Sequence, residues 1–224
     1  MGVVFLHSGI TDARQWEREI REWRFEAEAP DVHEGFELDK PSILVGNSFG
    51  GRVAMELALA RPDLVTGLVL VASALPGSAS SPELDAIDEH EERLYEAGDY
   101  ASAAQLMVET WVPGAPEHVR AYVREAQERA YEQPAVDWLP RANRPLSERL
   151  GDIRAPVLLV DGELDRPEFH QIADRLEREV ADVRGRTTIP GAHHLPNLER
   201  PEEFDAAVLP FIDGLRRASP PIPA

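Results

Sequence analysis

The chain has no cysteine among its 224 residues. Disulfide bonds and thiolate metal sites are therefore excluded. Basic residues are also few, since the chain has 23 Lys and Arg and 41 Asp and Glu, which gives a formal net charge of −18. Such a surface lacks the basic footprint that phosphates or an anionic membrane surface require, so we expect neither nucleic-acid nor membrane binding.

Long apolar runs are missing as well. No stretch of about 18 apolar residues occurs, so no membrane-spanning helix is predicted. The N-terminal residues MGVVFLHSG have no basic segment and no long apolar core, and they do not resemble a secretory signal peptide. The sequence contains no internal repeat, no G-x-G-x-x-G fingerprint, no P-loop and no histidine spacing typical of a metal site. We therefore expect a cytoplasmic protein that uses no cofactor and no metal.

The sequence does contain short apolar runs separated by helical segments. Runs rich in β-branched residues, each too short for a helix, lie at residues 3–6, 43–45, 68–71 and 157–160, with a weaker one at 184–189. Runs that are apolar throughout are typical of strands buried on both faces of a parallel sheet. Helical signals lie between and after them, at residues 12–23, 51–61, 168–180 and 201–215. This alternation predicts a doubly wound α/β fold.

The middle of the chain is different. Residues 78–150 contain no strand-like run, and three helical segments are predicted there, at 82–97, 100–111 and 116–133. Proline stands at the start of the first and third segments, as is common in the first turn of a helix. We therefore expect a core formed by residues 1–77 and 151–224, with residues 78–150 inserted as a helical cap.

One short motif points to chemistry. Gly46-Asn47-Ser48-Phe49-Gly50 matches the pattern G-x-S-x-G, follows an apolar run and opens a helical segment. In this strand–turn–helix context a serine sits on a sharp turn with its hydroxyl exposed at the edge of the sheet. The alternative is a glycine-rich turn that only starts a helix. Because the helix N-terminus would place free N–H groups beside the serine, Ser48 is a candidate nucleophile.

A serine hydroxyl is a weak nucleophile unless a base takes its proton and a carboxylate orients that base. An acidic loop after the fourth apolar run offers Asp161, Glu163 and Asp165 as the acid. Two adjacent histidines, His193 and His194, follow the last predicted strand and could supply the base. The order serine, acid, histidine along the chain is that of the α/β-hydrolases.

Taken together, these motifs resemble the α/β-hydrolases of the esterase and enol-lactonase-like group. The matching stretches cover nearly the whole chain: LHSG at 6–9, GNSFGG at 46–51, GELD at 162–165, and GAHHLP at 191–196 followed by Glu199 and Pro201. The resemblance implies an α/β-hydrolase fold with a mostly parallel sheet and a helical cap.

The resemblance also implies roles for particular residues. Ser48 resembles the nucleophile, Asp165 the acid and His194 the base of a catalytic triad. Asp165 is favoured because the family pattern places the acid three residues after the glycine, and His194 because the pattern runs glycine, two residues, histidine, apolar residue, proline. The backbone N–H groups of Gly9 and Phe49 resemble the oxyanion hole, which stabilises the developing negative charge.

The expected activity is hydrolysis of a small carboxylic ester or lactone through an acyl-enzyme. Met107, Trp111 and Trp138 in the insertion are candidate pocket walls, although core packing would explain Met107 and Trp111 equally well. His7 is expected to fix the oxyanion loop by hydrogen bonding. The same fold also hosts C–C bond hydrolases, perhydrolases and ligand receptors, which are the alternatives.

The chain departs from the family in two places. It begins at what resembles the family's third strand, without the leading antiparallel hairpin. Residues 24–41 are also too few for the usual strand, long loop and helix, although residues 25–31 could supply the strand. We therefore expect a minimal sheet of about six strands, in which the shape of the pocket changes and the chemistry does not.

Overall fold

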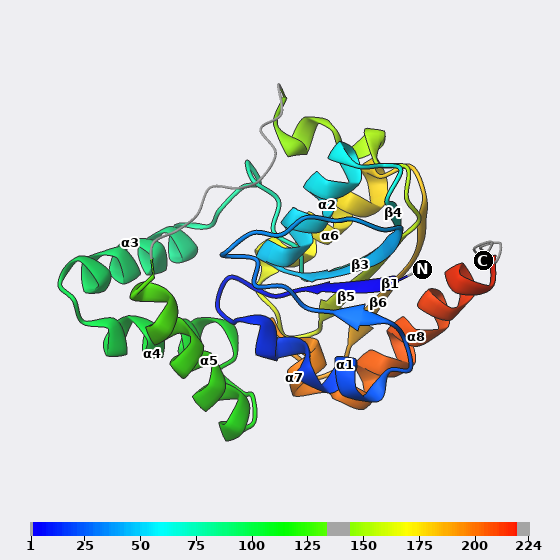
Figure 1. Cartoon of the computed structure of the whole chain (residues 1–224). Helices are drawn as coiled ribbons and strands as arrows, with labels where there is room; N and C mark the ends of the chain where they lie inside the picture. The colour runs from blue at the N-terminus through cyan, green and yellow to red at the C-terminus, as the bar shows by residue number, and fades with distance from the viewer. Residues whose placement is uncertain (1, 134–143, 219–224) are drawn as a thin grey trace.

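The computed structural model describes residues 2–133 and 144–218 (Figure 1). Six strands form one sheet in the order β2-β1-β3-β4-β5-β6, and every neighbouring pair is parallel. The strands are β1 (Gly2–Leu6), β2 (Ala27–Glu28), β3 (Ser42–Asn47), β4 (Val65–Val71), β5 (Val157–Gly162) and β6 (Val183–Ile189). The structure therefore confirms the parallel sheet of about six strands.

Helices cover both faces of this sheet. Figure 1 shows α2 (Phe49–Ala60) and α6 (Pro167–Glu179) on one face. The opposite face carries η1 (Ala13–Trp16), α1 (Glu17–Glu22), α7 (Pro196–Glu199) and α8 (Pro201–Ala218). Short 3-10 turns η2 (Leu146–Glu148) and η3 (Leu150–Asp152) precede β5.

Successive side chains of a strand point to opposite faces, so the central strands contribute to two cores. Val4, Leu6 and Leu44 lie in the core beneath α2 and α6. Val3 and Phe5 lie in the core beneath α8. Because both faces are buried, the strands need apolar side chains throughout, which is why their runs do not alternate with polar residues.

The helical insertion follows β4 and comprises α3 (Pro82–Glu96), α4 (Tyr100–Trp111) and α5 (Glu117–Tyr131). Figure 1 shows these helices beyond the edge of the sheet where the strands end. Val108, Val119 and Val123 of α4 and α5 pack in a separate core that includes Leu195 and is contacted by Ile10. The insertion therefore rests on two loops that follow strands β1 and β6.

Two segments differ from the sequence expectations. The helix predicted at residues 12–23 is a 3-10 turn followed by the six-residue α1, and Asp12 caps the turn by accepting the Arg14 N–H. Between Trp23 and β3 the described residues contain β2 and no helix, in agreement with the expected loss. No helix in the described ranges combines the length and apolarity needed to span a bilayer.

Candidate active site

Ser48 lies at the sharp turn between β3 and α2. Its φ of 53° and ψ of −112° belong to a strained region for a residue with a side chain. A Cβ atom on Gly46 would overlap the carbonyl oxygen of Gly50, and a Cβ on Gly50 would overlap the carbonyl oxygen of Leu6. The two glycines of the motif are therefore required because the turn is packed against its own backbone and against the end of β1.

His194 and Asp165 form a buried pair. The His194 Nδ1 atom lies 2.9 and 3.1 Å from the two carboxylate oxygens of Asp165. Both side chains are 2 % exposed. Asp165 follows β5, and its carboxylate also accepts the Arg166 N–H at 2.8 Å. Because Nδ1 is occupied by the carboxylate, Nε2 is the ring nitrogen that can exchange a proton with a substrate or a hydroxyl.

The other two acids of this loop are bound elsewhere. The Asp161 carboxylate accepts a hydrogen bond from Arg186 Nε at 2.7 Å. Burial raises the pKa of Asp161, and the hydrogen bond from Arg186 offsets part of this effect. Glu163 accepts the Gly191 N–H at 2.9 Å. Asp161 and Glu163 are therefore bound to Arg186 and to the Gly191 N–H, and Asp165 is the acid of this loop that is bound to His194.

The histidine loop is held by a second carboxylate. Glu199 is 4 % exposed and accepts the backbone N–H groups of His193 and Leu195. It also lies 2.8 Å from His193 Nδ1. The two histidines thus face different carboxylates. A Cβ on Gly162 would overlap the carbonyl oxygen of His193, so the acid loop and the histidine loop are in direct backbone contact.

Aromatic rings surround His194. Its ring centroid lies 4.7 Å from the Trp111 ring and 4.4 Å from the Phe169 ring. The His194 N–H also donates to the Trp111 carbonyl oxygen at 3.3 Å. Trp111 therefore reaches the site, whereas Met107 is a buried residue of α4 and Trp138 lies outside the described residues. The sequence alone does not identify Phe169 as a site residue, because an apolar residue in a helical pattern cannot be told apart from an ordinary core residue.

Gly9 and Phe49 lie side by side. A Cβ atom on Gly9 would be 3.6 Å from the Phe49 Cβ, which is an ordinary contact distance. Phe49 is the first residue of α2, so its N–H has no carbonyl partner within the helix. The structure thus brings the loop after β1 against the turn that carries Ser48.

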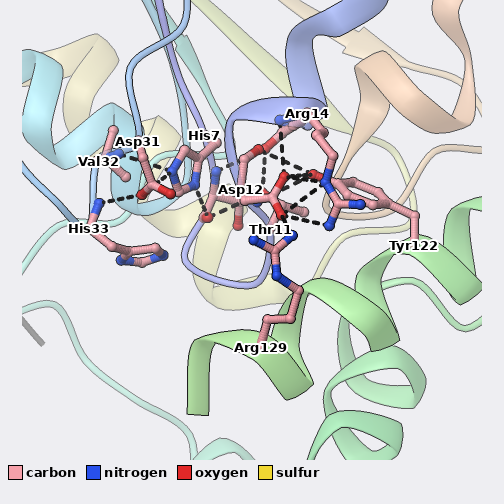
Figure 2. A network of polar contacts seen from close by, with 11 residues as sticks. His7, Thr11, Asp12, Arg14, Asp31, Val32, His33, Tyr122 and Arg129 are labelled. Carbon is pink, nitrogen blue, oxygen red and sulfur yellow. Dashed lines mark hydrogen bonds and ion pairs between the residues drawn. The ribbon is translucent and has the colours of Figure 1, made fainter. Parts of the chain in front are cut away.

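His7 anchors one side of this loop, as Figure 2 shows. Its Nδ1 lies 2.9 Å from the Ser8 carbonyl oxygen, and its Nε2 lies 3.0 Å from the Val32 backbone nitrogen. The Asp31 carboxylate lies 3.2 Å from the same Nε2. The contact with His7 lowers the pKa of Asp31 to about 2. Burial lowers the pKa of the neighbouring His33, so its neutral form is favoured.

The insertion holds the other side of the loop (Figure 2). The Tyr122 hydroxyl of α5 accepts the Asp12 N–H at 3.2 Å and lies 3.1 Å from an Asp12 carboxylate oxygen. Burial raises the pKa of Tyr122, which keeps this hydroxyl protonated. Arg14 and Arg129 lie 2.8 and 3.5 Å from the same carboxylate. No local sequence pattern indicates this contact, because the two residues are 110 positions apart.

Two cavities of about 360 and 240 Å³ lie along α6 and the 77–83 segment. Neither is lined by Ser48, Asp165 or His194. Within residues 2–133 and 144–218 no three His, Asp or Glu side chains are grouped as ligands for a metal ion. Ser48, Asp165, His194 and the Gly9 loop each follow the carboxyl end of a strand of this sheet.

Comparison with known proteins places the chain in a family. The model of the alpha/beta hydrolase family matches residues 6–207. A pimeloyl-(acyl-carrier protein) methyl ester esterase from Photobacterium profundum is 28% identical over 188 residues, which cover 78% of this chain and 73% of that protein. Lipase LipV from Mycobacterium tuberculosis is 55% identical over 51 residues, which cover 22% of this chain and only 20% of the lipase.

Solved structures share the fold. MenH from S. aureus superposes with a TM-score of 0.73 at 18% identity and covers 96% of this chain and 94% of its own. A thermophilic esterase from Thermogutta terrifontis has a TM-score of 0.74 at 21% identity, with 96% and 90% covered. The family match spans most of the chain and agrees with the fold and the arrangement of its motifs. The protein belongs to the alpha/beta hydrolase family.

Proposed function

We propose that this protein is a serine hydrolase that cleaves small carboxylic esters or lactones through an acyl-enzyme. The observation that carries the proposal is the buried His194–Asp165 pair. This pair lies in loops at the carboxyl ends of the parallel strands, and the strained Ser48 turn lies at the same edge of the sheet. A base oriented by a carboxylate and a serine on a sharp strand–helix turn are the parts that nucleophilic acyl transfer requires.

In this mechanism the Ser48 oxygen attacks the substrate carbonyl carbon while His194 Nε2 takes the serine proton. Asp165 holds the ring through Nδ1 and stabilises the imidazolium that forms. The negative charge on the carbonyl oxygen is met by the N–H groups of Gly9 and Phe49. The bond between the carbonyl carbon and the leaving oxygen then breaks as His194 gives its proton to the departing alcohol, and the acyl group stays on Ser48. Water, deprotonated by the same nitrogen, attacks this acyl-enzyme, and His194 returns the proton to the Ser48 oxygen as the acid leaves.

The ester class is supported by a relative, because the 28% identical protein from Photobacterium profundum is a methyl ester esterase. A small acyl group is supported by the rings of Trp111 and Phe169, which stand within contact of His194 and limit the space beside it. We assign residues 78–150 as a cap that contributes Trp111 to this site. Residues 1–77 and 151–224 form the catalytic core.

The test is a fluorophosphonate probe, which labels activated serines, together with p-nitrophenyl esters of two to sixteen carbons. Wild-type protein should be labelled and should hydrolyse acetyl or butyryl esters fastest. Ser48→Ala should lose labelling and lower kcat by on the order of 10⁴-fold while remaining folded. Ser102→Ala, a matched serine in α4, should behave as wild type.

Different outcomes exclude different parts of the proposal. Full activity of Ser48→Ala would refute the nucleophile. Fast labelling of Ser48 without turnover of any ester would point to a C–C bond hydrolase or a perhydrolase instead. Slow labelling with almost no turnover would point to a ligand receptor. A maximum at the palmitoyl ester would contradict the small acyl site.

A further inference from the structure

A buried glutamine lies between the loop that contains Gly9, the turn that carries Ser48 and the loop that carries His194. Gln15 is in the 3-10 turn η1 and is fully buried. Its side-chain oxygen accepts the Ser8 N–H at 2.9 Å and lies 2.6 Å from the Thr11 hydroxyl. Both partners belong to the loop that contains Gly9. One end of the Gln15 amide therefore holds the loop proposed to form the oxyanion hole.

The other end of the amide faces two asparagines. Gln15 Nε2 lies 2.8 Å from the Asn47 side-chain oxygen and 3.1 Å from that of Asn197. The orientation of the amide is determined by its surroundings, because the Ser8 N–H can only donate and must face the Gln15 oxygen. Asn197 Nδ2 in turn donates to the backbone carbonyl oxygen of Gln15 at 3.1 Å, which closes a ring of hydrogen bonds between these two residues.

Asn47 continues the chain of contacts to the proposed base. This residue precedes Ser48 and is fully buried. Its Nδ2 donates to the Val71 carbonyl oxygen at 3.0 Å and to the His194 carbonyl oxygen at 3.1 Å. Both of these partners can only accept, so the Asn47 oxygen must face Gln15. The path from the Gly9 loop to the His194 backbone therefore runs through Gln15 and Asn47.

We propose that Gln15 is a positioning residue, which sets the oxyanion loop and the histidine loop in register with the turn that carries Ser48. This inference rests on the proposed function of that site. Gln15 touches no reacting atom. It acts because the donors to the oxyanion come from one loop and the base from another, and its two-ended amide fixes the distance between them. Acyl transfer is sensitive to such distances, since misplacement by about 1 Å can cost a factor of about 100 in rate.

Two substitutions separate positioning from stability. Gln15→Leu removes all four side-chain hydrogen bonds. Gln15→Glu keeps the acceptors for Ser8 and Thr11 but has no N–H for Asn47 and Asn197, so it breaks only the connection towards His194. The matched control is Gln127→Leu, which removes a buried amide of α5 that lies against Tyr131. Each variant is assayed well below its unfolding midpoint, as measured by circular dichroism.

The readouts are kcat and KM for p-nitrophenyl acetate and the rate at which fluorophosphonate labels Ser48. Both Gln15 variants should lower kcat and the labelling rate by about 10- to 100-fold, with KM changed by less than about threefold. Gln127→Leu should stay within about twofold of wild type. The double variant of Gln15→Leu and Asn47→Leu should lose little more than Gln15→Leu, because the two side chains act in series.

A folded Gln15→Leu with wild-type kcat and labelling would overturn the inference, even if its unfolding midpoint fell, because the residue would then serve stability alone. If that variant does not fold, two other variants decide in the same way. Gln15→Glu loses the donor to the Asn47 side-chain oxygen, and Asn47→Asp keeps that oxygen but loses the donor to the His194 carbonyl oxygen. Wild-type protein whose Ser48 is never labelled would overturn the proposed function and this inference with it. Normal wild-type labelling with unaffected Gln15 variants overturns this inference alone.

Discussion

His193 and His194 are neighbours in the chain, yet each imidazole is bound by its own buried carboxylate. Asp165 comes from the loop after β5 and binds His194, whereas Glu199 comes from α7 and binds His193. Glu199 also accepts two backbone N–H groups of the histidine loop, and these hydrogen bonds stabilise the conformation of the loop. The pairing gives the two histidines different expected roles.

Replacing each histidine by alanine tests this difference. His194→Ala should lower kcat for a short ester by on the order of 10⁴-fold, because every proton transfer of the proposed mechanism passes through its Nε2. His193→Ala is the matched control at the adjacent position and should keep kcat within about threefold. Steady-state kinetics on both variants, with circular dichroism to establish folding, make the measurement. An inactive His193→Ala beside an active His194→Ala would reverse the assignment.

Among the larger elements, α5 makes a polar connection between the insertion and the core loop proposed to stabilise the oxyanion. The connection is made by the Tyr122 hydroxyl on Asp12, supported by Arg14 and Arg129 (Figure 2). Asp12 also caps the turn that contains Gln15, and Gln15 accepts the Ser8 N–H. A displacement of α5 would therefore move the Asp12 end of the Gly9 loop and, through Gln15, its Ser8 end. We therefore expect the insertion to support the loop, in addition to its proposed role as a cap.

Tyr122→Phe removes only the hydroxyl and leaves the Asp12 N–H without this acceptor. We expect the free energy of unfolding to fall by about 1–2 kcal/mol. We also expect kcat to fall several-fold with KM nearly unchanged, because the loop loses a restraint. Urea unfolding and ester kinetics measure the two effects. Tyr100→Phe is the control, because the Tyr100 ring packs against Tyr95 and Tyr131 within the insertion. Unchanged kcat beside lowered stability would contradict the support role.

Most helices and strands could be predicted from the sequence, because buried strands and amphipathic helices leave local apolar patterns. Residues 100–111 and α4 coincide, and each of the five predicted strands is present. The one edge strand that was only suggested, β2, is two residues long and polar on one side, so its pattern was weak. The helix α7 was not predicted, because four residues are too few to show a period.

The site was predictable only as far as its motifs reach. Ser48, Asp165 and His194 stand in stretches with recognisable spacing, and the structure brings Asp165 to His194 and Gly9 to Phe49. Their assignment to a triad and an oxyanion hole stays a prediction for the experiments above. Contacts such as that between Gln15 and Asn197, 182 residues apart, leave no local pattern, because only the fold brings those side chains together.

For the molecule as a whole, one buried carboxyl ties stability to pH. Glu19 of α1 is fully buried, and loss of hydration raises its pKa from 4.5 to about 7. Between these values the folded chain holds a proton that the unfolded chain has released. The resulting contribution to stability, about 3 kcal/mol at most, is therefore fully present below pH 4.5 and is lost as the pH rises through 7.

Glu19→Gln removes this dependence because the amide has no proton to lose. The free energy of unfolding of the variant, relative to wild type, should rise between pH 5 and pH 8. Glu17→Gln in the same helix is the control, since Glu17 is exposed and the difference from wild type should stay flat. Urea unfolding at several pH values gives both differences. Parallel curves for Glu19→Gln and wild type would mean that Glu19 does not govern this part of the profile.

The open sheet has two outer strands, β2 and β6, and each discourages further growth. A free edge offers unpaired N–H and C=O groups to a strand from another molecule, which is how aggregates begin. β2 is only two residues long, and β6 carries Arg184 and Arg186 within its seven. Arg186 is further committed to Asp161 and Asp174. A strand from a second molecule would meet charged side chains at β6 and only two residues to pair with at β2. The sheet can therefore keep two open edges without promoting edge-to-edge association between copies of the chain.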